Sequence, residues 1–337
     1  MKALLVFAAL SLFAAGLALS ISLERKRQDG TDRLALLRGL LRRAAIIFLI
    51  GLLLNLIPAF QLASLRVPGV LQRIALTVVI AAPIVIWGRW RAALAAILGL
   101  VALYLVLMLL VPVSGSDGLV AAGRLEPGHD FGAWLDRLTL GGHLWSSSRT
   151  WDPEGIVSTL PATASLLFGV LAGAYLATPT GRLPKSLALL LGGLLCLGLG
   201  LGLGAVLIPV NKNLWTPSYA VFTTGWSLVI LAACHALLEE APPRLRTLAR
   251  QACLPLTIYG RNALFLFVCS GLIARLLQGI QVASGGVPMP LKAWLFQGLS
   301  ALPLSPENAS LLFALVFNLV MFTIAWALWR KQWFVKV

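Results

Sequence analysis

Long apolar runs, each about the length of a membrane-spanning helix, are separated by short polar segments along this chain. A helix needs about 20 mainly apolar residues to cross the hydrocarbon core of a bilayer. The runs are continuous, whereas the strands of a membrane barrel alternate apolar and polar positions. The pattern therefore predicts an all-α, polytopic helical membrane protein with about nine transmembrane helices. The predicted spans are residues 3–22, 44–60, 71–87, 92–113, 159–177, 186–210, 217–238, 254–277 and 308–329.

Composition supports this class and excludes others. Of the 337 residues, 59% are hydrophobic and 12% are charged, against about 45–50% and about 25% in soluble domains. These values exclude a water-soluble domain, a disordered chain and a disulfide scaffold. The net charge of +15 would indicate a nucleic-acid partner in a soluble protein, but here the basic residues lie between apolar runs, where membrane topology accounts for them. We therefore expect the lipid bilayer as a partner and no nucleic acid.

Lys and Arg residues are distributed unevenly between the two sets of connections. One set carries 18 of them and the other carries eight. The richer set consists of residues 23–43, 88–91, 178–185, 239–261 and the tail from residue 330. By the positive-inside rule this set is cytoplasmic, and so is the C-terminus. The outer side then carries the long connections at about 114–158 and 278–307, and residues 1–337 are expected to form a single transmembrane domain.

Polar residues gather at the predicted outer ends of the helices, and the first cluster contains Arg66, Gln72 and Arg73. Two guanidinium groups and an amide at the mouth of a helix bundle are suited to hold phosphate or carboxylate. The alternative is that the arginines extend to lipid headgroups.

A second cluster lies at residues 151–161. Asp152 is expected to cap a helix that begins at Pro153, with Glu154 in its first turn. As an alternative, the carboxylate of Glu154 orients a histidine or binds a sugar hydroxyl. His143 is the nearest histidine in the sequence, although a loop histidine is more often a surface residue than a base.

The third cluster combines two amides, an ammonium group and an indole, from Asn211, Lys212, Asn213 and Trp215. It can form a hydrogen-bonding platform, or it can anchor the chain at the membrane interface. Asn55 and Asn262 are further amides that lie within apolar runs, where polar groups are costly and are functional candidates by default.

Other segments carry packing predictions. The glycine-rich run 186–210 favours close contact between helices. The apolar stretch Leu291–Leu302, in the second outer connection, is expected to lie flat at the membrane interface. Four cysteines lie in or beside apolar segments without the spacing of metal ligands, so we expect no metal site.

The motifs together resemble the heparan-α-glucosaminide N-acetyltransferase family of transmembrane acyltransferases, which includes bacterial members. Residues 65–74 look like the most recognisable signature of that family. Residues 152–161 and 211–216 match two further motifs in the same order, and residues 262–263 are similar to a weaker fourth. The resemblance covers nearly the whole chain.

The resemblance implies that an acetyl group moves from acetyl-CoA, the acyl donor, to a sugar amine or hydroxyl of a glycan. The sugar receives the acetyl group on the outer side of the membrane. We expect this membrane to be a bacterial cytoplasmic (inner) membrane. Glu154 is assigned to catalysis, with His143 as a fallback base. The residues assigned to donor or acceptor binding are Arg66, Gln72, Arg73, Asp152, Asn211, Lys212, Asn213, Trp215 and Asn262. No metal is implied, and a homodimer is compatible with such a bundle.

One departure from the family concerns the start of the chain. Family members begin with an additional helix, followed by an outer loop that carries the catalytic histidine. Since this chain starts at Met1 within that region, we expect a truncated reading frame, a fragment, or a member that has lost activity. Two alternatives stay open: a permease for a small polar solute, and an inactive structural relic.

The predicted orientation can be tested with single cysteines introduced by Ser147→Cys and Gln332→Cys. In intact cells an impermeant thiol reagent should label the cysteine at position 147 and leave the one at position 332 unlabelled, because the richer set of basic loops is cytoplasmic. Labelling at position 332 alone would reverse the orientation.

Overall fold

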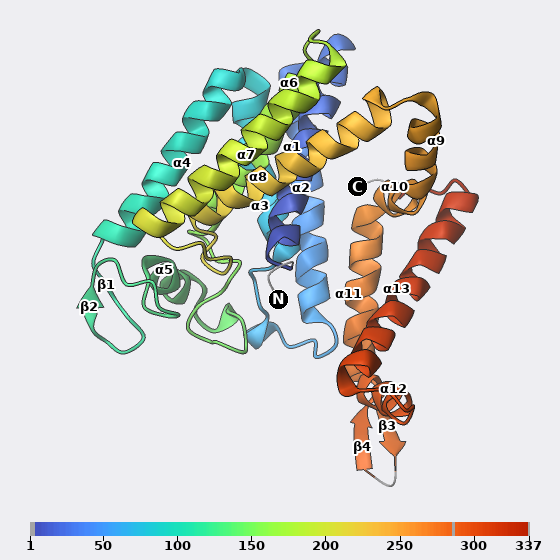
Figure 1. Ribbon diagram of the computed structural model, residues 1–337. Coiled ribbons are helices and arrows are strands. Elements are labelled where there is room, and N and C mark those ends of the chain that lie inside the picture. Colours follow the sequence, from blue (N-terminus) through green and yellow to red (C-terminus); the bar gives the residue numbers. More distant parts are fainter. Residues whose placement is uncertain (1–3, 285–286, 336–337) are drawn as a thin grey trace. The chain divides into compact units, whose positions relative to one another are not determined.

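The computed structural model describes residues 4–284 and 287–335, and nearly all of its regular structure is helical (Figure 1). Each predicted span falls on a helix except 254–277, which falls on two, and residue 3 of the first span lies outside the described residues. Within those residues, seven helices are long and apolar enough to cross a membrane, and a bent pair brings the number to eight. The prediction of an all-α, polytopic membrane protein is confirmed.

Contacts between residues divide the chain into two compact units. Unit 1 comprises Met1–Leu52 and Ala63–Arg246, and unit 2 comprises Leu53–Leu62 and Thr247–Val337. The boundaries fall within or beside helices, so α2 and α9 contribute residues to both units. That residues 1–337 act as a single domain stays a prediction.

The elements of the first part of the chain begin with α1 (Leu4–Gln28), α2 (Arg33–Leu56), η1 (Leu62–Ser64), α3 (Val70–Trp87) and α4 (Trp90–Leu110). They continue with β1 (Val113–Ser114), β2 (Val120–Ala121), α5 (Phe131–Leu140), η2 (Gly141–His143) and α6 (Thr159–Leu176). The last are α7 (Arg182–Val206), α8 (Pro217–His235), the π-helical turn η3 (Ala236–Glu240) and α9 (Pro243–Ala252).

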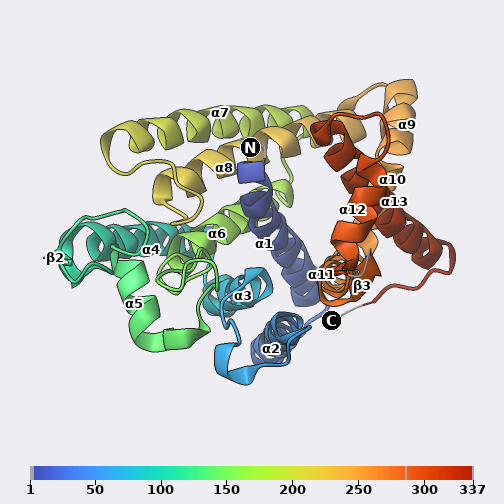
Figure 2. The ribbon, with the colours of Figure 1, turned by 90° about the horizontal axis from the view of Figure 1, so that it is seen from below.

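Helix α6 is the central helix of unit 1, and it packs against α1, α3, α4 and α8 (Figure 2). Its contact with α1 is a backbone contact. A Cβ atom added at Gly169 would lie 2.0 Å from the Phe13 carbonyl oxygen, and one added at Gly16 would lie 1.9 Å from the Leu166 oxygen. Only glycine permits this approach, which lets α6 pack closely on α1 without side chains between the two backbones.

Helices α7 and α8 lie side by side in both ribbon views, and glycines again determine the contact (Figures 1 and 2). A Cβ added at Gly193 would lie 3.0 Å from the Gly225 oxygen, and one added at Gly200 would lie 2.6 Å from the Phe222 backbone. The predicted packing role of the glycine-rich run is confirmed at these two positions. It is wrong for Gly198 and Gly202, whose added Cβ would meet no atom within 4 Å.

Some predicted connections are more ordered than expected. Most of the predicted inner loop 23–43 is helical, because α1 and α2 extend into it, and the predicted loop 239–261 contains α9. The outer connection 114–158 holds the β1–β2 hairpin and α5, whose first turn is capped by Asp130 through a 2.9 Å bond from Ala133 N. Figure 1 shows this connection at one end of unit 1. The segment that the charge distribution predicts to be outer therefore contains regular structure of its own.

Unit 2 contains the remaining elements: α10 (Leu254–Arg261), α11 (Ala263–Gly279), β3 (Gln281–Ser284), β4 (Val287–Pro290), α12 (Leu291–Ser300) and α13 (Pro306–Arg330). The predicted span 254–277 is wrong as a single straight helix, because the chain bends by 80° between α10 and α11 at Asn262. The Asn262 side chain donates to the Trp333 oxygen (3.0 Å) and accepts from Val335 N (2.9 Å), so it holds the C-terminal segment at the bend. The apolar stretch predicted at 291–302 forms α12.

The α1–α6 contact yields a stability prediction. We expect Gly169→Ala to lower the free energy of unfolding by about 1–3 kcal/mol, because the added methyl group meets a backbone oxygen that cannot rotate away. Thermal unfolding in detergent measures the change. Gly99→Ala in α4 is the control, since its added Cβ meets no atom within 4 Å, and it should be neutral or slightly stabilising. Equal effects of the two substitutions would contradict the contact.

Candidate active site

The segment before α3 is tied to the loop before α6 by an arginine and two carboxylates. Arg66 donates through Nε (2.9 Å) and Nη2 (2.6 Å) to both oxygens of Asp152. Its Nη2 also lies 2.6 Å from Glu154 Oε2. Partial burial lowers the pKa of Arg66, but the bonds and charges of the two acids outweigh it and raise the pKa. The two-pronged contact fixes the guanidinium plane and joins two motifs that are 86 residues apart.

Asp152 therefore has a different role from the one predicted. The expected helix cap is wrong, because α6 begins at Thr159 and residues 151–158 form turns. The carboxylate accepts from Glu154 N (3.0 Å) within such a turn while it binds Arg66. An aspartate can cap a turn and hold an ion pair at the same time. In the sequence, an aspartate that caps a turn looks the same as one that caps a helix.

Arg73 is the buried cation of the site. Its side chain lies in the first turn of α3, the residue is 4% exposed, and Nη2 donates to the Pro153 oxygen (2.6 Å) and the Ser158 hydroxyl. The guanidinium carbon lies 4.8 Å from the centre of the Trp215 ring, which is a cation–π distance. Among the described residues, Arg73 Nε has no hydrogen-bond partner. A buried donor without a partner is costly and marks a place for an acceptor atom.

The loop before α8 places Trp215 against Arg73. Asn211 Oδ1 accepts from Asn213 N (2.8 Å), and the Trp215 indole donates to Ser165 (3.2 Å). The backbone of Trp215 has a φ of 49°, in the left-handed region that a bulky residue rarely adopts. Such strain persists only where the surroundings hold it, and it concentrates at functional sites.

These elements enclose a cavity of about 120 Å³, called here the main cavity. Its polar lining comes from Arg73, Glu154, Lys212 and Asn213, which belong to three separate motifs. Arg73, Glu154 and Asn213, which the sequence analysis placed in three separate clusters, therefore line one cavity, while their roles stay predictions. Two cations, a carboxylate and an exposed amide thus face the same space, and this combination suits a ligand that carries both hydrogen-bond acceptors and a basic or hydroxyl group.

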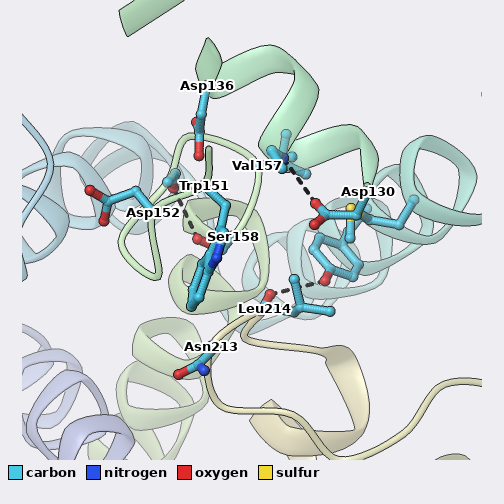
Figure 3. Close-up of a pocket in the computed structure, with 13 residues that line it drawn as sticks. Asp130, Asp136, Trp151, Asp152, Val157, Ser158, Asn213 and Leu214 are labelled. Carbon is cyan, nitrogen blue, oxygen red and sulfur yellow. Dashed lines mark hydrogen bonds between the residues drawn. The ribbon is translucent and has the colours of Figure 1, made fainter. Parts of the chain in front are cut away.

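A second, smaller cavity of about 20 Å³ shares Asn213 with the main cavity (Figure 3). Its volume suits one water molecule. Carboxylates of Asp130, Asp136 and Asp152 line it, together with Ser158. Figure 3 shows Asn213 on the side opposite Asp136. The lining makes this small cavity acidic, and Asn213 contributes to the walls of both cavities.

Asp136 is a carboxyl group that no pattern in the sequence distinguishes. It lies on α5 and is 2% exposed, and its Oδ1 accepts from Ile156 N (2.9 Å). Burial raises its pKa to about 7, and the charge of Asp152 adds to the rise. A Cβ added at Gly155 would lie 2.0 Å from Asp136 Oδ2, so the glycine of the second motif makes room for this acid.

Three predicted residues have local structural contacts. His143 Nδ1 lies 2.8 Å from the Leu65 oxygen, and since a carbonyl only accepts, Nδ1 donates. The neutral ring then keeps a lone pair on Nε2, although neither cavity's described lining includes His143. Gln72 is buried beside Gly51 of α2, and Asn211 organises its own turn. Their catalytic or binding roles stay predictions.

Asn262 belongs to unit 2, whereas both cavities lie in unit 1. Its amide is used at the bend before α11, and a binding role stays a prediction. Residues missed in the sequence are Ser158, Tyr104 and Asp136. Tyr104 is buried in α4, and its hydroxyl donates to the Leu214 oxygen (2.9 Å). A single tyrosine in an apolar run was a usable signal, while nothing local marked Asp136.

Known proteins that are similar to this chain belong to the same family that its sequence motifs resemble. Residues 3–128 match the family model described as heparan-alpha-glucosaminide N-acetyltransferase, catalytic. The chain is thus similar to heparan-α-glucosaminide N-acetyltransferases over this part. It is 27% identical over 285 residues to the human enzyme of that name and 25% identical over 285 residues to the mouse enzyme. These alignments cover 67% of this chain and 42% of each relative, so the chain spans about two fifths of their length.

The family match and the site overlap only in part. The matched residues 3–128 include Arg66 and Arg73, while Glu154 and Asn213 lie beyond them. Within residues 4–284 and 287–335, no group of three or more His, Cys, Asp or Glu side chains is arranged to hold a metal ion. Because the chain spans less than half of these relatives, its activity, like its donor and acceptor, belongs to the proposal that follows.

The raised pKa of Asp136 predicts how stability depends on pH. Because the pKa in the folded protein is about 7 and in an unfolded chain about 4, folding takes up a proton between these values. Stability therefore falls as pH rises from about 4 to about 7, and the loss is complete above that range. Asp136→Asn retains an acceptor for Ile156 N and does not ionise. It should raise the unfolding temperature relative to wild type more at pH 8 than at pH 5.

Thermal unfolding at the two pH values checks this prediction. The control is Asp117→Asn, which removes an exposed acid paired with Arg124 and should not become more stabilising as pH rises. A difference between Asp136→Asn and wild type that does not change with pH would show that Asp136 has an ordinary pKa.

Proposed function

We propose that this protein transfers the acetyl group of acetyl-CoA to an amine or hydroxyl of a sugar on the outer side of a membrane, in the manner of heparan-α-glucosaminide N-acetyltransferase. The observation that supports it best is the main cavity. There, three motifs that resemble those of the family bring a buried cation, a carboxylate and an amide to one space. A C-terminus in the cytoplasm and a bacterial cytoplasmic membrane are part of this proposal.

Arg73 is suited to polarise the thioester. Its Nε–H is buried and lacks an acceptor among the described residues, and its orientation is fixed by Ser158 and by the Trp215 ring. A preorganised donor of this kind stabilises the oxyanion that develops when a nucleophile attacks a carbonyl carbon. Lys212 adds a second positive charge for an oxyanion or a phosphate.

Glu154 and Asn213 are suited to hold the acceptor. Glu154 lines the cavity and is anchored by Arg66 through one oxygen, so the carboxylate faces the space in a fixed orientation. A carboxylate accepts from an ammonium or hydroxyl group, and an amide both donates and accepts. Holding the acceptor beside the thioester supplies the proximity that acyl transfer needs.

The reaction forms a C–N or C–O bond and breaks the thioester C–S bond. The acceptor proton passes to a base, and the leaving thiolate of CoA is protonated afterwards. A histidine suits this task because its pKa is near working pH. In this chain His143 is the fallback base: its Nδ1 donates to the Leu65 oxygen, and it lies outside the described lining of both cavities.

The test measures acetyl transfer by the purified protein from radiolabelled acetyl-CoA to glucosamine and other amino sugars. Arg73→Gln, Glu154→Gln and Asn213→Ala should each reduce the rate by about tenfold or more, which corresponds to a loss of about 1.4 kcal/mol in transition-state stabilisation. His143→Gln should lower the rate as strongly if the fallback base acts in the reaction, and an unchanged rate would exclude that role. Arg124→Gln, outside both cavities, is the matched control and should leave the rate unchanged.

Failure to acetylate any acceptor, or equal rates for the cavity variants and the control, would overturn the proposal. Uptake of an amino sugar into proteoliposomes without acetylation, and independent of acetyl-CoA, would favour a permease instead. Such uptake should then be abolished by the same cavity variants, because the cavity would serve recognition of the solute.

A further inference from the structure

Unit 2 contains a cavity of about 280 Å³ that is separate from the two cavities described above. It lies between α11, α12 and α13, and all of its lining residues belong to unit 2. Its apolar wall includes Leu277, Phe313 and Phe317. Its polar groups are Arg275, Gln278 and Lys292, and its described lining contains no Asp or Glu. The cavity is therefore amphipathic and positively charged.

Arg275 lies on α11, within an apolar helix. Its Nη2 donates to Asn55 Oδ1 (2.9 Å), from the residues of α2 that belong to unit 2. The amide orients the guanidinium group without cancelling its charge. An ionisable residue in such a helix is costly and is a functional candidate. Since Arg275 Nη1 also lies 3.5 Å from the Gly271 oxygen, the guanidinium group is held in place where it lines the cavity.

Lys292 supplies the second charge. It is the second residue of α12, it is exposed, and it lines the same cavity as Arg275. In the predicted topology both residues are on the outer side, so the positive-inside rule does not account for them. Unit 2 as a whole has seven Lys or Arg and one acid, Glu307. Charge complementarity therefore calls for an anion that also has an apolar part.

We propose that this cavity binds an anionic phospholipid of the surrounding membrane, with its phosphate between Arg275 and Lys292 and an acyl chain along Phe313 and Phe317. A guanidinium group binds phosphate through two parallel hydrogen bonds, and an ammonium group adds a point charge. Basic pockets between membrane helices bind anionic headgroups on the cytoplasmic or matrix side, and the same pairing of charges applies to an anionic headgroup of the outer leaflet. The inference does not rest on the acetyltransferase activity, because it uses other residues and a different cavity.

The experiment uses the full chain, stripped of lipid and placed in nanodiscs of phosphatidylcholine with increasing phosphatidylglycerol. Native mass spectrometry after release counts the phosphatidylglycerol that is retained. We expect phosphatidylglycerol to be retained at a lipid concentration about tenfold lower than the concentration at which phosphatidylcholine is retained. Lys292→Gln should weaken retention by about fivefold, near the effect of removing one basic residue at a membrane surface, and Lys292→Arg should restore it.

Matched variants keep the result interpretable. Lys331→Gln makes the same change of charge in unit 2 but lies outside the cavity, where the ammonium group packs on the Trp333 ring, and it should retain lipid as wild type does. Arg275→Gln should weaken retention at least as much as Lys292→Gln. If Arg275→Gln does not fold, the exposed Lys292 variant decides alone.

Three results would overturn the proposal. The first is equal retention of phosphatidylglycerol and phosphatidylcholine, and the second is equal retention by Lys292→Gln and Lys331→Gln. The third is complete competition by millimolar inorganic phosphate, which would identify a free-anion site that does not use the acyl chain. All of these experiments measure lipid retention, and none of them measures acetyl transfer. Loss of the lipid site and loss of the proposed activity can therefore be distinguished.

Discussion

Burial of one positive charge at the mouth of the helix bundle determines much of the structure around it. Arg73 is nearly inaccessible, and a buried guanidinium group is tolerated only with hydrogen bonds and nearby negative charge. Pro153 and Ser158 supply the bonds, and Trp215 supplies a ring. The loops before α6 and α8 must therefore fold around the first turn of α3. The cavity beside them is a consequence of satisfying that charge.

The glycine contact between α1 and α6 helps to hold the residues around Arg73 in place, because it fixes the position of α6. Because the two backbones touch at Gly16 and Gly169, α6 is held closely while its other faces pack on α3 and α4. The N-terminal end of α6 carries Ser158 and Thr159 into the site, so small errors in helix position would reach the hydrogen bonds of Arg73. Close packing without intervening side chains leaves few alternative arrangements.

Hydropathy predicted the helices well because a span needs only its own residues to be apolar. The bend at Asn262 was not predicted, since it depends on the C-terminal segment that this side chain holds. Three motifs line a shared cavity, yet equal residue types within them have different roles. Asn211 ties a turn while Asn213 faces both cavities, and no local signal separates the two. Asp136 was missed because its burial is produced by α5 folding onto a distant loop.

The contact between α5 and the loop before α6 also has an evolutionary consequence. A Cβ at position 155 would lie 2.0 Å from Asp136 Oδ2, so any larger residue there must displace the Asp136 side chain, which accepts from Ile156 N. The two positions, 19 residues apart in the chain, are therefore coupled, and we expect substitutions at one to accompany substitutions at the other among related sequences.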